Sequence, residues 1–68
     1  MKLQELLSLH SVNTYVSINK DTEPKKIKEV YKSPIYPMIE DRTVETVSLH
    51  TFYDHNDLVN VYMYIKII

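Results

Sequence analysis

The sequence predicts a small α+β domain, in which a short N-terminal helix is followed by a three- to four-stranded, mostly antiparallel β-meander. The last residues of the chain carry the main evidence, because from 59 to 67 the odd positions are apolar and the even positions are Asn60, Tyr62, Tyr64 and Lys66. Alternation of this kind is typical of a strand with one buried face. Residues 44–53 alternate similarly, whereas the leucines near the N-terminus recur at helical spacing. We expect one domain spanning residues 1–68.

The helical spacing predicts a helix over residues 2–9. Its apolar face consists of three leucines and a histidine at i, i+3, i+4 and i+7, namely Leu3, Leu6, Leu7 and His10. A helix this short is unstable alone in water, so it should dock on the sheet. We expect its leucines to cover the apolar row of the last strand at Val61, Met63 and Ile65.

Residues 12–18 alternate and predict a first strand, and the Asn, Asp and Pro residues of 19–24 predict a turn. Residues 25–36 are ambiguous. An edge strand protected by lysines fits them, and we favour it. A helix capped by Asp21 or Thr22 is the alternative, because Ile27, Val30 and Tyr31 lie at helical spacing. Residues 37–42 predict a single helical turn.

Residues 44–53 and 58–67 predict a hairpin closed by the loop 54–57. A shared core face requires paired residue numbers with an even sum near 112, which sets Leu49 opposite Met63. The chain has no glycine. Positions with positive φ must then fall to asparagine or aspartate, and the candidates are Asn13, Asn19, Asp21, Asn56 and Asp57.

The composition excludes several functional classes. A chain of 68 residues without glycine or cysteine lacks phosphate-binding loops, disulfides and thiolate metal sites. His50, Asp54, His55 and Asp57 are metal-ligand types, but a strand and a loop tip should keep them apart. We therefore expect no enzyme activity, metal, cofactor or small-molecule substrate. No apolar run approaches a membrane span, and residues 1–10 are too polar for a signal peptide, so we expect a cytoplasmic protein.

A tyrosine-rich row predicts a surface that binds another protein. The candidate partner-binding residues are Tyr15, Tyr62, Tyr64 and Lys66, since tyrosine supplies rigid apolar area and a hydroxyl at interfaces. A domain of this size with an exposed sheet edge also favours self-association, and we expect a homo-oligomer. The predicted function is that of a non-enzymatic protein-interaction module.

Single-stranded nucleic acid is the alternative partner. Five of the eight cations lie within residues 20–32, where three acidic side chains partly offset them. Bases could stack on the tyrosine face over a basic rim. The residues of this alternative site are Lys25, Lys26, Lys28, Lys32 and Tyr31.

Three pieces of the chain carry a resemblance at the level of pattern: the opening segment 1–7, the segment 40–44 before a strand, and the alternating terminal strand. In outline the sequence resembles very short uncharacterised phage and prophage proteins of low-GC Gram-positive bacteria. The resemblance implies an accessory phage protein that binds a host protein in the host cytoplasm. It implies no particular functional residues.

Overall fold

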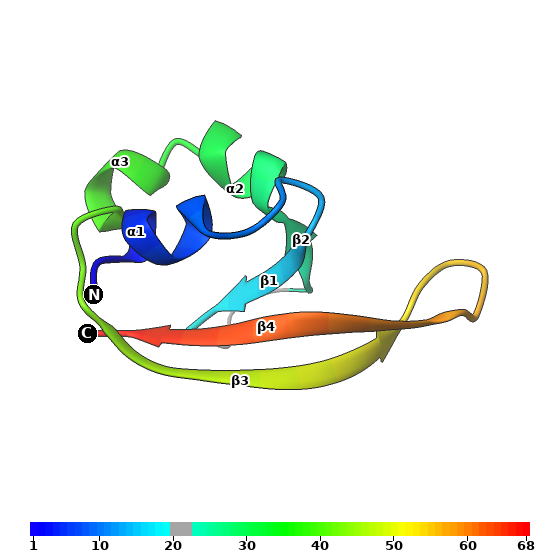
Figure 1. The fold of residues 1–68 in the computed structure, drawn as a ribbon. Coiled ribbons are helices and arrows are strands. Elements are labelled where there is room, and N and C mark those ends of the chain that lie inside the picture. The colour runs from blue at the N-terminus through cyan, green and yellow to red at the C-terminus, as the bar shows by residue number, and fades with distance from the viewer. Residues whose placement is uncertain (20–22) are drawn as a thin grey trace.

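The computed structural model describes residues 1–19 and 23–68 and confirms the predicted α+β class. The helices of this part of the chain are α1 (Leu3–Ser8), α2 (Ile27–Lys32) and α3 (Tyr36–Ile39). The strands are β1 (Tyr15–Ile18), β2 (Lys25–Lys26), β3 (Val44–Tyr53) and β4 (Val59–Ile67). All three helices lie on one side of the sheet (Figure 1).

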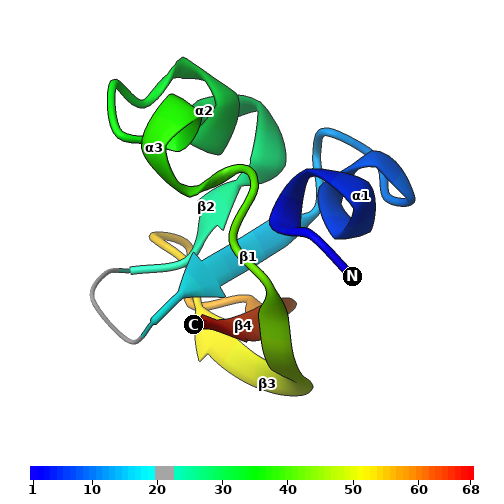
Figure 2. The same ribbon diagram turned by 90° about the vertical axis from the view of Figure 1, so that its left-hand side faces the viewer.

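The sheet is mixed, with the strand order β2-β1-β4-β3. The pairs β1–β2 and β3–β4 are antiparallel, as expected, whereas β1 and β4 run parallel. Figure 2 shows β4 lying between β1 and β3. The strand with the clearest alternation in the sequence is therefore a central strand of the sheet.

The predicted register of the β3–β4 hairpin is confirmed. Leu49 pairs with Met63, and the pairs on either side are Val47–Ile65 and Thr51–Val61. A register shift between Val44 and Thr46 marks a bulge near the start of β3. From residue 46 onward, the odd-numbered side chains of both strands share the face that carries the helices.

The strand that we favoured for residues 25–36 is wrong over most of that range. Only Lys25–Lys26 pairs as a strand, and residues 27–32 form α2. Ile27 and Val30 are both buried, which a helix achieves at a spacing of three and a strand does not. Lys26 holds the N-cap position of α2. The caps predicted at Asp21 and Thr22, like the turn residues 20–22, lie outside the described residues.

The core lies between the helices and the neighbouring part of the sheet. Its buried apolar residues are Leu3, Leu6, Leu7, Val16, Ile27, Val30, Met63, Ile65 and Ile67. The docking of α1 near Met63 and Ile65 agrees with the prediction. Val61 is 56% exposed, however, and its predicted place in the core is wrong. The six residues of α1 make a helix only about 9 Å long, which is too short to cover the whole hairpin.

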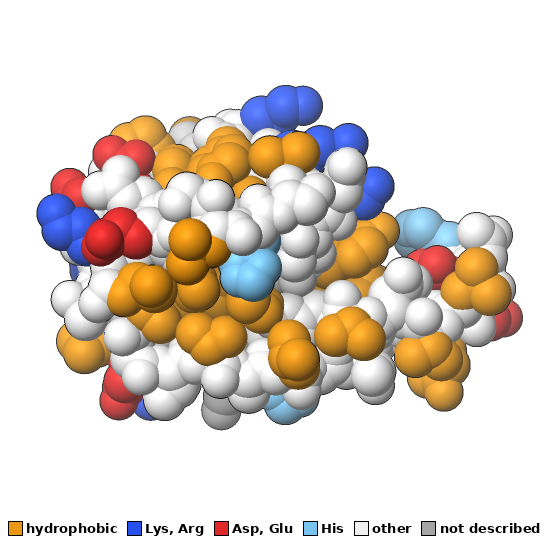
Figure 3. All heavy atoms as spheres, in the orientation of Figure 1, with side chains coloured by type: hydrophobic (Ala, Val, Ile, Leu, Met, Phe, Trp, Pro, Cys, Tyr) orange, Lys and Arg blue, Asp and Glu red, His pale blue; other side chains and the backbone are white. Residues whose placement is uncertain are grey.

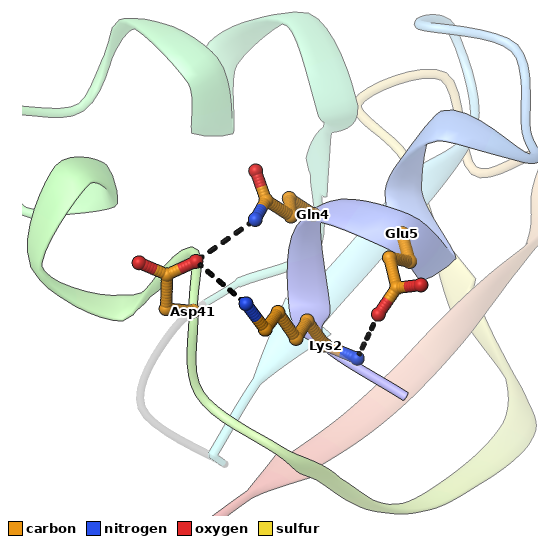
Figure 4. A network of polar contacts seen from close by, with 4 residues as sticks. All are labelled: Lys2, Gln4, Glu5 and Asp41. Carbon is orange, nitrogen blue, oxygen red and sulfur yellow. Dashed lines mark hydrogen bonds and ion pairs between the residues drawn. The ribbon is translucent and has the colours of Figure 1, made fainter.

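Polar contacts tie α1 to the segment that leads into β3 (Figure 4). The Gln4 amide donates a 2.8 Å hydrogen bond to the Asp41 carboxylate, and the Lys2 ammonium lies 3.6 Å from the same carboxylate. The backbone N–H of Lys2 donates to Glu5 at 2.8 Å. These groups are exposed, so each contact stabilises the fold by about 1 kcal/mol or less. Their main effect is to fix the direction of α1.

Among residues 1–19 and 23–68, two of the candidate positions take up positive φ, as the absence of glycine predicted, whereas the candidate Asp21 lies outside these ranges. Asn19 has φ 54° and Asp57 has φ 57°. Asn19 follows the end of β1, and Asp57 lies in the hairpin loop. Asparagine and aspartate visit this region more readily than other non-glycine residues, because their short polar side chains bond locally.

Candidate partner-binding face of the sheet

The sheet face opposite the helices displays the even-numbered side chains of the hairpin. The strand registers align one row across all four strands: Lys26 is opposite Tyr15, Tyr15 is opposite Tyr62, and Tyr62 is opposite His50. Side chains of directly paired residues project from the same face. The row therefore begins with a cation and continues with three rings.

Five rings on this face contact one another, and we call them the aromatic cluster: Tyr15, His50, Phe52, Tyr62 and Tyr64. Phe52 meets Tyr15 edge-on with ring centroids 5.0 Å apart, and it meets Tyr62 at 5.8 Å. His50 stacks on Tyr62 at 5.6 Å and meets Tyr64 edge-on at 6.0 Å. These separations are those of favourable aromatic pairs. The rings hold one another in place across three strands.

The aromatic cluster is half-covered. Its four carbon rings are partly buried and His50 is exposed, while Ser17, which pairs with Tyr64, is buried. The described helices all lie on the opposite side of the sheet (Figure 1), so the rings shield one another. Their remaining surface is open to a partner.

Polar groups border the cluster. The Lys26 ammonium lies 5.8 Å from the centre of the Tyr15 ring, within the range of a cation–π contact. The Lys66 ammonium lies 3.5 Å from the Glu45 carboxylate, and both side chains are about half exposed. The Ser48 hydroxyl and His50 Nε2 are 2.9 Å apart. The apolar rings therefore have a charged and hydrogen-bonding rim.

The loop at the tip of the hairpin is held by one carboxylate. Asp54 accepts hydrogen bonds from the backbone N–H groups of Asn56, at 2.8 Å, and Leu58, at 3.0 Å. The Asn60 amide donates a third at 2.9 Å. The two backbone bonds are the main cause that lowers the pKa of Asp54, since they favour its charged form. This loop fixes the end of β3 that carries Phe52.

The structure places the four residues predicted to bind a partner on one face of the sheet. Tyr15, Tyr62 and Tyr64 belong to the aromatic cluster, and Lys66 lies further along β4 on the same face. His50 and Phe52 were missed, although the predicted register sets His50 opposite Tyr62 and Phe52 opposite Asn60. Applying the register to the polar row would have found both residues.

Tyr31 does not lie on the sheet face, which corrects its place among the stacking residues. It belongs to α2 and contacts Tyr36 edge-on, with ring centroids 5.2 Å apart. Burial is the first cause that raises the pKa of Tyr36, followed by the neighbouring Tyr31 and the acidic Glu40 and Asp41. This pair is part of the helical layer.

The lysines of the alternative site adjoin one end of the aromatic cluster. Lys25 and Lys26 form β2, whereas Lys28 and Lys32 belong to α2. A shallow depression connects Tyr15 with some of these lysines; it is lined by Tyr15, Lys25, Lys26, Glu29, Lys32, Ser33 and Pro34. Lys20 lies outside the described residues.

We also searched the described residues for a metal site and for a membrane-spanning helix. Among residues 1–19 and 23–68, no three histidine, aspartate or glutamate side chains gather where they could hold a metal ion. None of the described helices is long and apolar enough to cross a membrane. No protein-family model, curated protein or solved structure matches the chain.

Proposed function

We propose that the chain is a non-enzymatic protein-interaction module that binds a partner protein through the aromatic cluster. The observation that carries the proposal is the contact of five rings on a sheet face with no described helix over it. Aromatic side chains are enriched at protein interfaces, where they combine apolar area with polar atoms at their edge.

The arrangement of the rings supports binding at low entropic cost. Ordering a mobile side chain at an interface costs about 0.5–1.5 kcal/mol. Each ring of the aromatic cluster is already held by at least one other ring, and His50, Phe52 and Tyr62 each contact two. Much of that ordering is therefore complete before a partner arrives. The rim residues Lys26 and Lys66 would then set the orientation of the partner.

The resemblance to short phage proteins supports a host protein as the partner. The proposal then places the complex in the host cytoplasm. The partner should present an apolar centre and an acidic margin to match the rings and Lys26.

The test replaces two rings together, Tyr62→Ser with Tyr64→Ser, in tagged protein. Both side chains are partly exposed on the open face, so we expect the fold to survive. Loss of central interface tyrosines should cost about 2 kcal/mol or more for the pair, so affinity should fall at least about 30-fold. The measurement is capture from a low-GC Gram-positive lysate, with and without nuclease, read by mass spectrometry and followed by a binding titration with the captured protein.

Tyr31→Ser is the matched control, because it removes a tyrosine of the helical layer. One protein should be captured in stoichiometric amount by the wild type and by this control, and lost by the double variant. Retention of the same protein by the double variant would contradict the proposed site. If circular dichroism shows that the double variant is unfolded, the rings act in stability and the proposed role of the face is wrong.

Single-stranded nucleic acid is the second candidate, and the depression that joins Tyr15 to Lys25, Lys26 and Lys32 favours it. Replacing Lys25, Lys26 and Lys28 together by glutamate should then abolish binding to a labelled single-stranded oligonucleotide. The wild-type affinity should fall steeply with salt, because each phosphate contact releases counterions. Absent or salt-independent binding would exclude this candidate.

A further inference from the structure

The outer edge of β3 is unusually open to another strand. β3 lies at the end of the sheet, and its ten residues include no proline. From Thr46 to Tyr53 it has no lysine, arginine, aspartate or glutamate, and its bulge lies before this stretch. Natural proteins commonly protect edge strands with charges, prolines or bulges. The uncharged part of β3 has none of these protections.

Apolar side chains flank this edge, and we call them the apolar flank: Val47, Leu49, Tyr53, Val59 and Val61. They are 44–73% exposed and occupy the odd positions of the hairpin, on the helix side of the sheet. Figure 3 shows hydrophobic side chains gathered along β3 and β4 below the helices. The helices reach Met63, Ile65 and Ile67 and leave the rest of this face bare.

We propose that a second copy of the chain pairs with this open edge, with β3 antiparallel to β3 of that copy around a two-fold axis at Leu49. In this register Leu49 meets Leu49 of the second copy, and Val47 meets Thr51. Odd positions then meet odd positions, so the two apolar flanks merge on one face. A two-fold interface must be self-complementary, and the uncharged stretch is close to centred on this axis.

The charges on β3 favour this arrangement. Glu45 is the charged residue of the strand, and it already pairs with Lys66. The proposed register sets Glu45 opposite Tyr53 of the second copy. The two Glu45 side chains are then about 25 Å apart along the ribbon, which is beyond the screening length of about 8–10 Å. No like charges meet across the strand pair.

The pairing also suits the side chains and backbone of this edge. It sets Val47, Leu49 and Thr51 of one copy beside those of the other, so apolar side chains meet across the strand pair. It gives hydrogen-bond partners to the backbone N–H and C=O groups along the free edge of β3.

The test is the oligomeric state of Leu49→Lys, measured by sedimentation velocity over a range of concentrations. Leu49 is 72% exposed, so the monomer should tolerate the change, whereas a dimer would set two lysines against each other. The matched control is Met38→Lys on α3, where the side chain is 75% exposed. We expect wild type and the control to dimerise and Leu49→Lys to remain monomeric. Mixing Leu49→Lys with Leu49→Glu should restore a dimer.

A wild type that stays monomeric at about 100 µM would overturn the proposal, and so would a Leu49→Lys protein that still dimerises. A second measurement uses only the wild type, so that a misfolded variant cannot be mistaken for a monomeric one. Amide exchange of wild-type β3 should slow as the protein concentration rises, and a dimer without this protection would place the interface elsewhere. Because the aromatic cluster lies on the other face, Tyr62→Ser with Tyr64→Ser should still dimerise. Failure of the dimer is thus distinguishable from failure of partner binding.

Discussion

At the scale of single residues, Asn19 joins β1 to β4. Its backbone has φ 54°, its N–H donates to the Ile65 carbonyl at 2.9 Å, and its side-chain oxygen accepts the Ile67 N–H at 2.8 Å. The positive φ and the side-chain bond both favour asparagine at this position. The end of β1 is thereby fixed to β4 at the centre of the sheet.

Asn19→Ala should destabilise the fold by about 2 kcal/mol or more, because alanine adds a cost at positive φ to the loss of the Ile67 hydrogen bond. Asn19→Gly should cost about 1 kcal/mol less than Asn19→Ala, since glycine accepts this backbone conformation. Urea unfolding of the three proteins gives both differences. Equal stability of the glycine and alanine variants would show that φ at this position has no energetic role.

The sequence allowed some single residues to be predicted and others not. The absence of glycine limited positive φ to five candidates, and of the four that the structure describes, Asn19 and Asp57 adopt it. The tyrosines of the sheet face followed from alternation alone. Phe52 and His50 required the hairpin register as well, because alternation shows which face a side chain occupies and not which rings meet across strands.

At the scale of elements, α1 is held by its buried side. Leu3 and Leu7 are fully buried in the core, whereas Leu9, directly after the helix, is 68% exposed. A six-residue helix has little stability of its own. Its contact with the sheet must therefore supply most of the free energy that holds it.

Leu7→Ala should destabilise the protein by about 2–5 kcal/mol, through lost burial and the cavity left behind. A domain this small has a stability of only about 3–5 kcal/mol, so the variant should be largely unfolded at 37 °C. Leu9→Ala is the control in the same segment and should change stability by about 0.5 kcal/mol or less. Thermal unfolding monitored by circular dichroism distinguishes them. A mild Leu7→Ala effect would mean that α1 is peripheral to the fold.

Elements with long, regular patterns were predicted well. The strand of residues 44–53 has the predicted bounds, and the N-terminal helix differs from its prediction by one residue at each end. The strand prediction for residues 25–36 failed because six of these twelve residues are lysine, glutamate or serine. Few apolar positions remain to distinguish a helical period from a strand period. Its first two residues pair with β1 before the chain turns into α2, so each interpretation fits a part.

At the scale of the whole molecule, burial changes along the hairpin. Met63, Ile65 and Ile67 lie under the helices, whereas Val59 and Val61 are more than half exposed. β1 pairs with β4 only from Tyr62 to Ile65. Beyond Tyr62, toward the loop, the hairpin has two strands and no helical cover. The fold thus has a stable end and a bare end.

Hydrogen exchange should follow this difference. Amides of residues 63–67 should exchange at least about 10-fold more slowly than those of 59–61, because local opening is easier where few apolar contacts and one neighbouring strand remain. Mass spectrometry or NMR at low protein concentration measures the exchange without self-association. Uniform protection along β4 would contradict the described limits of the helical layer.

The fold class was predictable as a whole, but the order of the strands was not. Helical spacing identified the N-terminal helix, and alternation identified a hairpin and a further strand. The short separation of 44–53 and 58–67 in the sequence made these two strands neighbours. Nothing in the pattern of β1 (Tyr15–Ile18) distinguishes a parallel neighbour from an antiparallel one. The sheet face that carries the tyrosines was predicted, but the exposure of the apolar flank was not. How far the helices extend over the sheet depends on their packing in the folded molecule and cannot be read from the alternation.

The parallel pairing of β1 with β4 also bears on synthesis. Each residue of β1 meets a residue about 47 positions later, as Tyr15 meets Tyr62. At a translation rate of 5–20 residues per second, the ribosome needs roughly 2–9 s to produce that neighbour. During this interval the first helix and strand have no β4 to dock on. The nascent chain therefore emerges largely unfolded and folds only after residue 67 has been made, which leaves its apolar segments open to chaperones in the meantime.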